Sequence, residues 1–128
     1  MASLNRVLIM DDEEMVREVL GEMLKILGYE PEFAIDGKEA IAKFLKAKQD
    51  GRPFAFVIMD LTVPGGMGGK EAIWELRKID PNIKVIVSSG YAKDDVLLQY
   101  KGYGFDAALV KPYRLEELKK TIDQVMQS

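Results

Sequence analysis

The chain alternates short apolar runs with segments in which apolar residues recur at helical spacing. The uninterrupted apolar runs cover residues 7–10, 54–59, 85–87 and 107–110. Continuous runs of this length are typical of strands covered on both faces, as in a parallel sheet. A weaker strand is expected near residues 32–35, and Pro31 places it at a sheet edge, where a missing amide donor does little harm.

Between these runs, apolar residues three to four positions apart predict five helices. We expect Gly28 to end the first helix, Asp36 with Glu39 to cap the second, and Pro81 to follow the end of the third. Asp94 or Asp95 is expected to cap the short fourth helix. The residues expected to face inward are Val16, Val19, Leu20, Met23, Leu24 and Leu27; Ile41, Phe44 and Leu45; Ala72, Ile73, Leu76 and Ile79; Val96, Leu97 and Tyr100; and Leu115, Leu118, Ile122 and Val125 or Met126.

Alternation of strand and helix at this spacing predicts right-handed βαβ units, and therefore an α/β fold with a five-stranded parallel sheet and helices on both faces. A chain of 128 residues can bury one ordinary core, and no linker, repeat or low-complexity tract divides it. We therefore expect residues 1–128 to form a single domain with no output domain.

The composition excludes several kinds of site. The chain has no cysteine and no histidine, so it can form no disulfide, no Cys/His metal site, no Cys nucleophile and no Ser-His-Asp triad. A net charge of −3 argues against a surface that binds nucleic-acid phosphates. Since no apolar run approaches the roughly 18 residues of a membrane span and no secretory signal is visible, we expect no direct nucleic-acid or membrane partner and a cytoplasmic location.

Polar residues follow the predicted strands where a ligand site is expected, beyond the carboxyl ends of a parallel sheet. These residues are Asp11 and Asp12, Asp60, Ser88 and Ser89, and Lys111. Two carboxylates about 4 Å apart repel by roughly 4 kcal/mol at an effective dielectric near 20, so three of them need a cation or a raised pKa. Mg²⁺ suits such oxygen ligands, Lys111 supplies a second positive charge, and one carboxylate could be a nucleophile. The pattern predicts phosphoryl transfer onto an aspartate.

Four segments carry a resemblance to a known family: LIMDDEE, VIMDLTVPGGMGG, VIVSSGYA and ALVKPY. In order and spacing they resemble the receiver domain of two-component response regulators, from about Arg6 to the last helix. The resemblance implies a flavodoxin-like, three-layer (βα)5 sandwich with strand order 2-1-3-4-5. It also implies a phosphorelay protein that is no enzyme beyond its own self-catalysed phosphoryl acceptance and hydrolysis.

The resemblance also implies residue roles. Asp60 is implied as the phosphorylated residue, with Mg²⁺ held by Asp12, Asp60 and the backbone carbonyl of Thr62, and by Asp11 through water. Lys111 is implied to pair with the phosphoryl group. The bond from Lys111 to the following proline is implied to be cis.

The family pattern of hydroxyl, Gly and aromatic residue assigns the switch role to Ser89 rather than Ser88. Receivers often carry an aromatic residue three positions before the lysine, but that position is Ala108 here. As a hypothesis, Tyr91 or Phe105 fills the space. The Gly-rich loop of residues 65–69, together with SSGYA, resembles receivers attached to hybrid sensor histidine kinases, of which this chain would be a piece.

The implied partners are a sensor histidine kinase or a phosphotransfer protein as phosphoryl donor, and a downstream protein that contacts the face of the fourth helix, fifth strand and fifth helix. Because the chain lacks histidine, the donor histidine must lie on another domain or protein, unless a small molecule replaces it. An alternative is a Mg²⁺-dependent phosphatase with an aspartyl-phosphate, although Thr62 stands where such enzymes usually have a general acid. A phosphorylation-independent pseudo-receiver is another, and a flavodoxin-like FMN binder is disfavoured because Asp11 and Asp12 would repel its phosphate.

Overall fold

Five parallel strands form one sheet in the order β2-β1-β3-β4-β5 in the computed structural model, which describes residues 5–127. The strands are β1 (Arg6–Met10), β2 (Glu30–Ala34), β3 (Phe56–Asp60), β4 (Lys84–Ser89) and β5 (Ala107–Val110). The predicted parallel sheet and strand order are confirmed. β2 lies at an edge and contains Pro31, whereas β1 and β3 are almost wholly buried.

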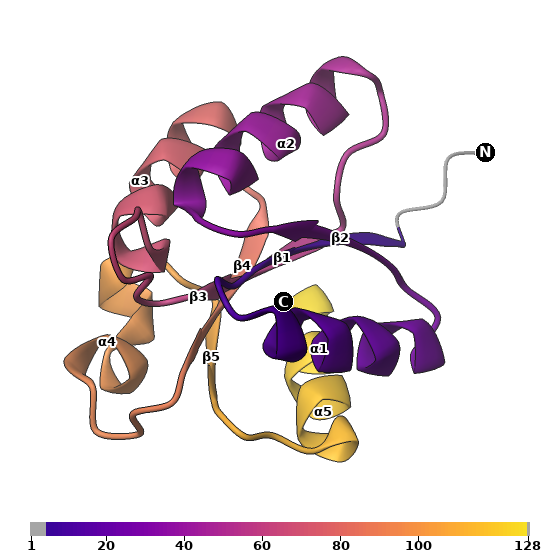
Figure 1. The fold of residues 1–128 in the computed structure, drawn as a ribbon. Coiled ribbons are helices and arrows are strands. Elements are labelled where there is room, and N and C mark those ends of the chain that lie inside the picture. Colours follow the sequence, from indigo (N-terminus) through magenta and orange to yellow (C-terminus); the bar gives the residue numbers. More distant parts are fainter. Residues whose placement is uncertain (1–4, 128) are drawn as a thin grey trace.

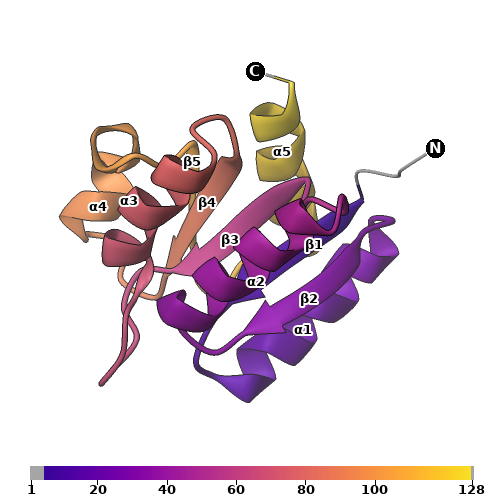
Figure 2. The same cartoon turned by 90° about the horizontal axis from the view of Figure 1, so that it is seen from above.

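Helices cover both faces of the sheet (Figures 1 and 2). They are α1 (Glu14–Ile26), α2 (Gly37–Gln49), α3 (Gly69–Ile79), α4 (Asp95–Leu98) and α5 (Leu115–Met126), with a 3-10 turn, η1, at Tyr100–Tyr103. α1 and α5 pack on one face, and α2, α3 and α4 pack on the other, so two apolar clusters lie on either side of the sheet. This arrangement is the predicted three-layer sandwich.

Local sequence signals set the helix ends. The Asp36 side chain accepts a bond of 2.8 Å from Glu39 N, while the Glu39 carboxylate accepts one of 2.8 Å from Ile35 N. Gly28 adopts a φ of 93° just after α1, a left-handed conformation that a glycine reaches without steric cost. Asp94 caps α4 by accepting from Val96 N at 2.9 Å. The predicted stop and caps are therefore confirmed.

Two residues expected to face inward are instead exposed, Val19 and Leu45, and of the alternatives Val125 and Met126 it is Val125 that is buried. Each exposed residue lies at the margin of an apolar stripe, and a helix on a sheet buries only the centre of that stripe. β3 begins two residues later than predicted and ends one residue later, and β4 is longer than predicted at both ends, with Asp60 and Ser88 paired in the strand register. Asp60, Ser88 and Ser89 are thus the last residues of strands rather than the first residues of loops.

The strand register brings the carboxyl ends of β1, β3, β4 and β5 to one edge of the sheet. Met10 pairs with Met59, Met59 with Val87, and Ser89 with Val110. The next residues along these strands therefore lie side by side, and they include the acidic residues and the lysine singled out in the sequence. Within residues 5–127, no helix is both long and apolar enough to cross a membrane.

Candidate functional site

Three carboxylates meet at the carboxyl edge of the sheet. Asp11 and Asp12 follow β1, and Asp60 ends β3; one carboxylate oxygen from each lies within 4.8 Å of the others. Asp11 is 3% exposed and Asp60 is 7% exposed, whereas Asp12 is open to solvent. The predicted acidic cluster therefore forms, with two buried members and one exposed member.

Lys111 joins the cluster from the end of β5. Its Nζ lies 2.6 Å from Asp11 Oδ2 and 3.4 Å from Asp60 Oδ1. Burial alone lowers the pKa of Lys111, but its hydrogen bond to Asp11 and the charges of Asp60 and Asp11 outweigh burial and raise that pKa overall. Lys111 is therefore a firmly charged ammonium between two carboxylates. The bond from Lys111 to Pro112 is cis, as the resemblance implies.

The Asp60 carboxyl has an unusual pKa. The pKa of Asp60 is raised from 3.8 to about 6, chiefly by burial and further by the charges of Asp11 and Asp12, against the lowering effect of Lys111. One lysine thus leaves the buried carboxylates short of positive charge. Since all the offered side-chain ligands are carboxylate oxygens, the donor set fits a hard divalent ion such as Mg²⁺. No contact among residues 5–127 tests whether the Thr62 carbonyl is a Mg²⁺ ligand, and this role stays a prediction.

Asp11 is held at four points besides its chain connections. Its N–H donates to Ala34 O at 3.0 Å, and its Oδ1 accepts from Glu13 N at 2.9 Å. Its carbonyl oxygen accepts from Arg17 Nη1 at 2.7 Å, and its Oδ2 pairs with Lys111. Sequence reasoning missed Arg17, whose one sequence signal is a basic side chain just after a run of four acidic residues and two apolar ones.

Ser89 lies at the end of β4, the strand next to β3. Its Oγ accepts a hydrogen bond of 3.1 Å from Tyr91 N. The side chain of Tyr91 is 62% exposed, so it does not fill the space beside Ala108. Phe105 is buried in the apolar cluster against which Ala108 packs, so of the two aromatic candidates only Phe105 contributes to that core. The neighbouring Ser88 is buried; its Oγ makes no hydrogen bond of ordinary geometry among residues 5–127, and the Tyr113 phenol is the polar group near it, whose pKa it lowers.

The β3–α3 loop passes very close to the end of β3. A Cβ atom on Gly68 would lie 2.4 Å from Leu61 O, and one on Gly69 would lie 2.8 Å from Asp60 O. Any larger residue at Gly68 would push the backbone that follows Asp60. The loop therefore needs glycine here for close approach, which explains part of its Gly-rich sequence.

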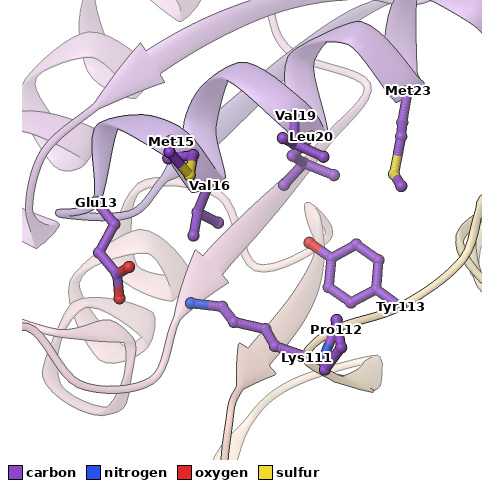
Figure 3. A pocket seen from close by; sticks show the side chains of 9 residues that line it. All are labelled: Glu13, Met15, Val16, Val19, Leu20, Met23, Lys111, Pro112 and Tyr113. Carbon is purple, nitrogen blue, oxygen red and sulfur yellow. The ribbon is translucent and has the colours of Figure 1, made fainter.

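An apolar groove of about 270 Å³ adjoins the acidic cluster (Figure 3). Side chains of α1 line one wall, and residues 112 and 113 line the other, with Lys111 and Glu13 at one end. Met15 and Val19 in this wall are exposed, so the outward position of Val19 reflects a groove. Burial raises the pKa of Tyr113 to about 12, against the influence of the nearby Ser88 hydroxyl and Lys111. Of the α1 side chains in this wall, the sequence predicts Val16, Val19, Leu20 and Met23 in the core; Leu20 is buried as predicted, and Val19 is exposed.

Comparison with known proteins decides the family. Residues 7–123 match the response regulator receiver domain. The chain belongs to this family. The receiver domain is 35% identical over 121 residues to the chemotaxis protein CheY of Thermotoga maritima, covering 94% of this chain and 96% of that protein.

Solved structures resemble the receiver domain over nearly its whole length. The chemotaxis protein CheY4 of Vibrio cholerae has a TM-score of 0.84 and 30% identity, covering 96% of this chain and 99% of its own. The response regulator TrrA of Thermotoga maritima, solved in complex with Mg²⁺ and BeF, has a TM-score of 0.81 and 31% identity, covering 94% and 98%. The resemblance and the flavodoxin-like fold drawn from the sequence are confirmed. The link to hybrid kinases stays a prediction.

Proposed function

We propose that this receiver domain accepts a phosphoryl group on Asp60. The observation that carries the proposal is a buried carboxylate, Asp60, that lies against Lys111 and beside two further carboxylates. In the proposed step an Asp60 carboxylate oxygen attacks the phosphorus of a phosphohistidine, the P–N bond breaks, and the imidazole nitrogen of the donor takes the bonding electrons.

Each residue of the site has a proposed part in this step. Asp12, Asp60 and the Thr62 carbonyl would hold Mg²⁺, with Asp11 acting through water; when bound, the ion neutralises charge on the phosphoryl oxygens. Lys111, already charged and 3.4 Å from Asp60, would pair with a phosphoryl oxygen. For that pairing, the Lys111 ammonium must either break its hydrogen bond to Asp11 or bind Asp11 and the phosphoryl oxygen at the same time.

Ser89 is proposed as the hydroxyl that turns toward the new phosphoryl group. Its Oγ would give up the bond from Tyr91 N, and because that bond ties the first residues after β4, the β4–α4 segment would shift with it. A downstream protein that contacts α4, β5 and α5 would recognise the shift. The structure of a phosphorylated chain bound to such a protein is the direct test of this output face.

The donor is proposed to be a sensor histidine kinase or a phosphotransfer protein, because the chain has no histidine of its own. A protein donor that reaches Asp60 past Lys111 also meets the apolar groove, whose wall includes the exposed Met15 and Val19. We infer that the groove contacts the donor. Met15→Ser should then slow transfer from a protein donor and leave phosphorylation by a small acyl phosphate unchanged. A cytoplasmic location stays a prediction.

The experiment that tests the function is incubation with Mg²⁺ and a small acyl phosphate, read by intact mass. We expect one added phosphoryl group per chain. No group should be added when a chelator is present from the start, and none should be added to Asp60→Asn. No gain in the unmodified chain would leave a pseudo-receiver as the explanation. Continuous release of phosphate at many turnovers per chain from unrelated phosphate esters would favour the phosphatase alternative, against which Thr62 argues.

A further inference from the structure

We propose that Arg17 is a positioning residue that holds the peptide between Asp11 and Asp12 and so aims the Asp12 carboxylate at the cation site. The inference rests on the proposed function, because it concerns the Mg²⁺ site of the same cluster. It adds a residue that lies outside the three carboxylates and Lys111.

Arg17 contacts the loop after β1 through both its side chain and its backbone. Its guanidinium Nη1 donates to Asp11 O at 2.7 Å, and its backbone N–H donates to Glu13 O at 3.1 Å in the first turn of α1. The side chain is half-buried, which shields the bond from water. A bond from a charged donor to a carbonyl is stronger than a neutral one, so this contact restrains the loop.

Asp12 is the member of the cluster that needs such a restraint. The Asp11 carboxylate is held by Glu13 N and Lys111, and Asp60 is held by strand pairing and Lys111. The Asp12 carboxylate is exposed, and no hydrogen bond or ion pair found among residues 5–127 holds it. Its direction therefore follows from the preceding peptide, whose carbonyl oxygen is the atom that Arg17 binds.

Charge and position make opposite predictions for Arg17, which makes the role testable. A positive guanidinium near the cluster repels a divalent cation, so removing it for its charge alone would tighten Mg²⁺ binding. If Arg17 positions Asp12, removing it weakens Mg²⁺ binding, as is typical when a residue that orients a metal ligand is lost. The sign of the change separates the two roles.

The test is calorimetric titration of the metal-free chain with Mg²⁺ alone, without phosphorylation. We expect Arg17→Ala to raise the Kd for Mg²⁺ by about tenfold, and Arg17→Lys, which keeps a charged donor, to recover part of that loss. Lys48→Met is the matched control: Lys48 donates to Ile79 O at 3.1 Å at the end of α3, so this variant also removes a cation that binds a backbone carbonyl, in the segment that leads into β4 rather than beyond the carboxyl ends of the strands. We expect its Kd to stay within about twofold of the unmodified chain.

Thermal unfolding without Mg²⁺ checks that each variant is folded, and only folded chains are titrated; should Arg17→Ala not fold, Arg17→Lys alone still has to show weakened binding. An unchanged or lower Kd in the Arg17 variants overturns the inference and leaves the proposed function standing. An equal rise in Lys48→Met also overturns it, since the effect would then come from lost charge or stability. Absence of Mg²⁺ binding in the unmodified chain overturns the metal site itself.

Discussion

The two sides of the site are held very differently. On the acidic side, Asp11 is bound at four atoms, and the β3–α3 loop lies within van der Waals contact of the end of β3. On the switch side, one hydrogen bond from Tyr91 N to Ser89 Oγ precedes a helix of four residues with exposed neighbours. Asp11 and the end of β3, on the side proposed to bind the cation, are thus held by many contacts, whereas the segment proposed to respond is held by fewer and can rearrange at lower energetic cost.

The largest expected contrast comes from one glycine on each side. Gly68→Ala places a Cβ 2.4 Å from Leu61 O, so the backbone after Asp60 must move, and we expect a loss of about 3 kcal/mol or more in the free energy of unfolding. Gly90→Ala meets nothing within 4 Å, and we expect a change within about 0.5 kcal/mol. Urea unfolding of both variants measures the contrast. Equal losses would show that the switch side is packed as tightly as the acidic side.

The next contrast lies within α4. Leu97 is 7% exposed and belongs to the apolar cluster under α4, whereas Leu98 is 67% exposed. Leu97→Ala should cost about 2 kcal/mol and release α4, whereas Leu98→Ala should cost less than about 0.5 kcal/mol. Hydrogen exchange gives the local test: amides of α4 and η1 should exchange faster in Leu97→Ala, and those of α1 should not. Faster exchange throughout α1 would mean that the two sides unfold as one unit.

The ionisation of Asp60 makes the free energy of unfolding depend on pH. Because its pKa rises from 3.8 to about 6 on folding, the folded chain binds its proton more tightly, and the free energy of unfolding falls as the pH rises from about 4 to 6. Asp60→Asn should therefore raise the free energy of unfolding of the metal-free chain at pH 7.5 by about 1 to 3 kcal/mol. This gain should disappear below about pH 4, where Asp60 of the unmodified chain is protonated in both the folded and the unfolded state. A gain that is equal at both pH values would contradict the assigned cause.

The smallest contrast is between the two serines that end β4. Ser89→Ala removes the acceptor of Tyr91 N and should cost about 0.5 to 1 kcal/mol. Ser88→Ala removes a buried hydroxyl without a partner among residues 5–127 and should raise the free energy of unfolding by up to about 1 kcal/mol. Thermal unfolding of the pair measures both. If Ser88→Ala instead lowers the free energy of unfolding by more than Ser89→Ala does, the Ser88 hydroxyl is hydrogen-bonded, and the Tyr113 phenol is the first candidate partner.

Much of the fold could be predicted because its signals are local. Continuous apolar runs mark four of the five strands, Pro31 marks one edge of the sheet, and the pair Asp36 and Glu39 marks a helix start. The breadth of each buried stripe could not be predicted, because it depends on what packs against the helix. Val19 shows this: its spacing is that of a core residue, but the facing β5–α5 loop leaves a groove.

The acidic cluster could also be predicted, because parallel strands bring Asp11, Asp12 and Asp60 to one edge whatever the details of packing. The direct pair between Asp11 and Lys111 was not expected, since side-chain reach across the edge depends on exact strand offsets. Arg17 was missed for a related reason. Its partner is a backbone carbonyl, and backbone groups leave no mark in the sequence.

The ion pair between Asp11 and Lys111 joins residues one hundred positions apart. Asp11 follows β1 and Lys111 follows β5, so the pair cannot form until β5 has docked beside β4. A chain in which β5 has not yet docked holds its acidic residues without their lysine. The site proposed to accept a phosphoryl group is therefore complete only when the whole sheet has assembled, so it reports the folding of the domain from its first strand to its fifth.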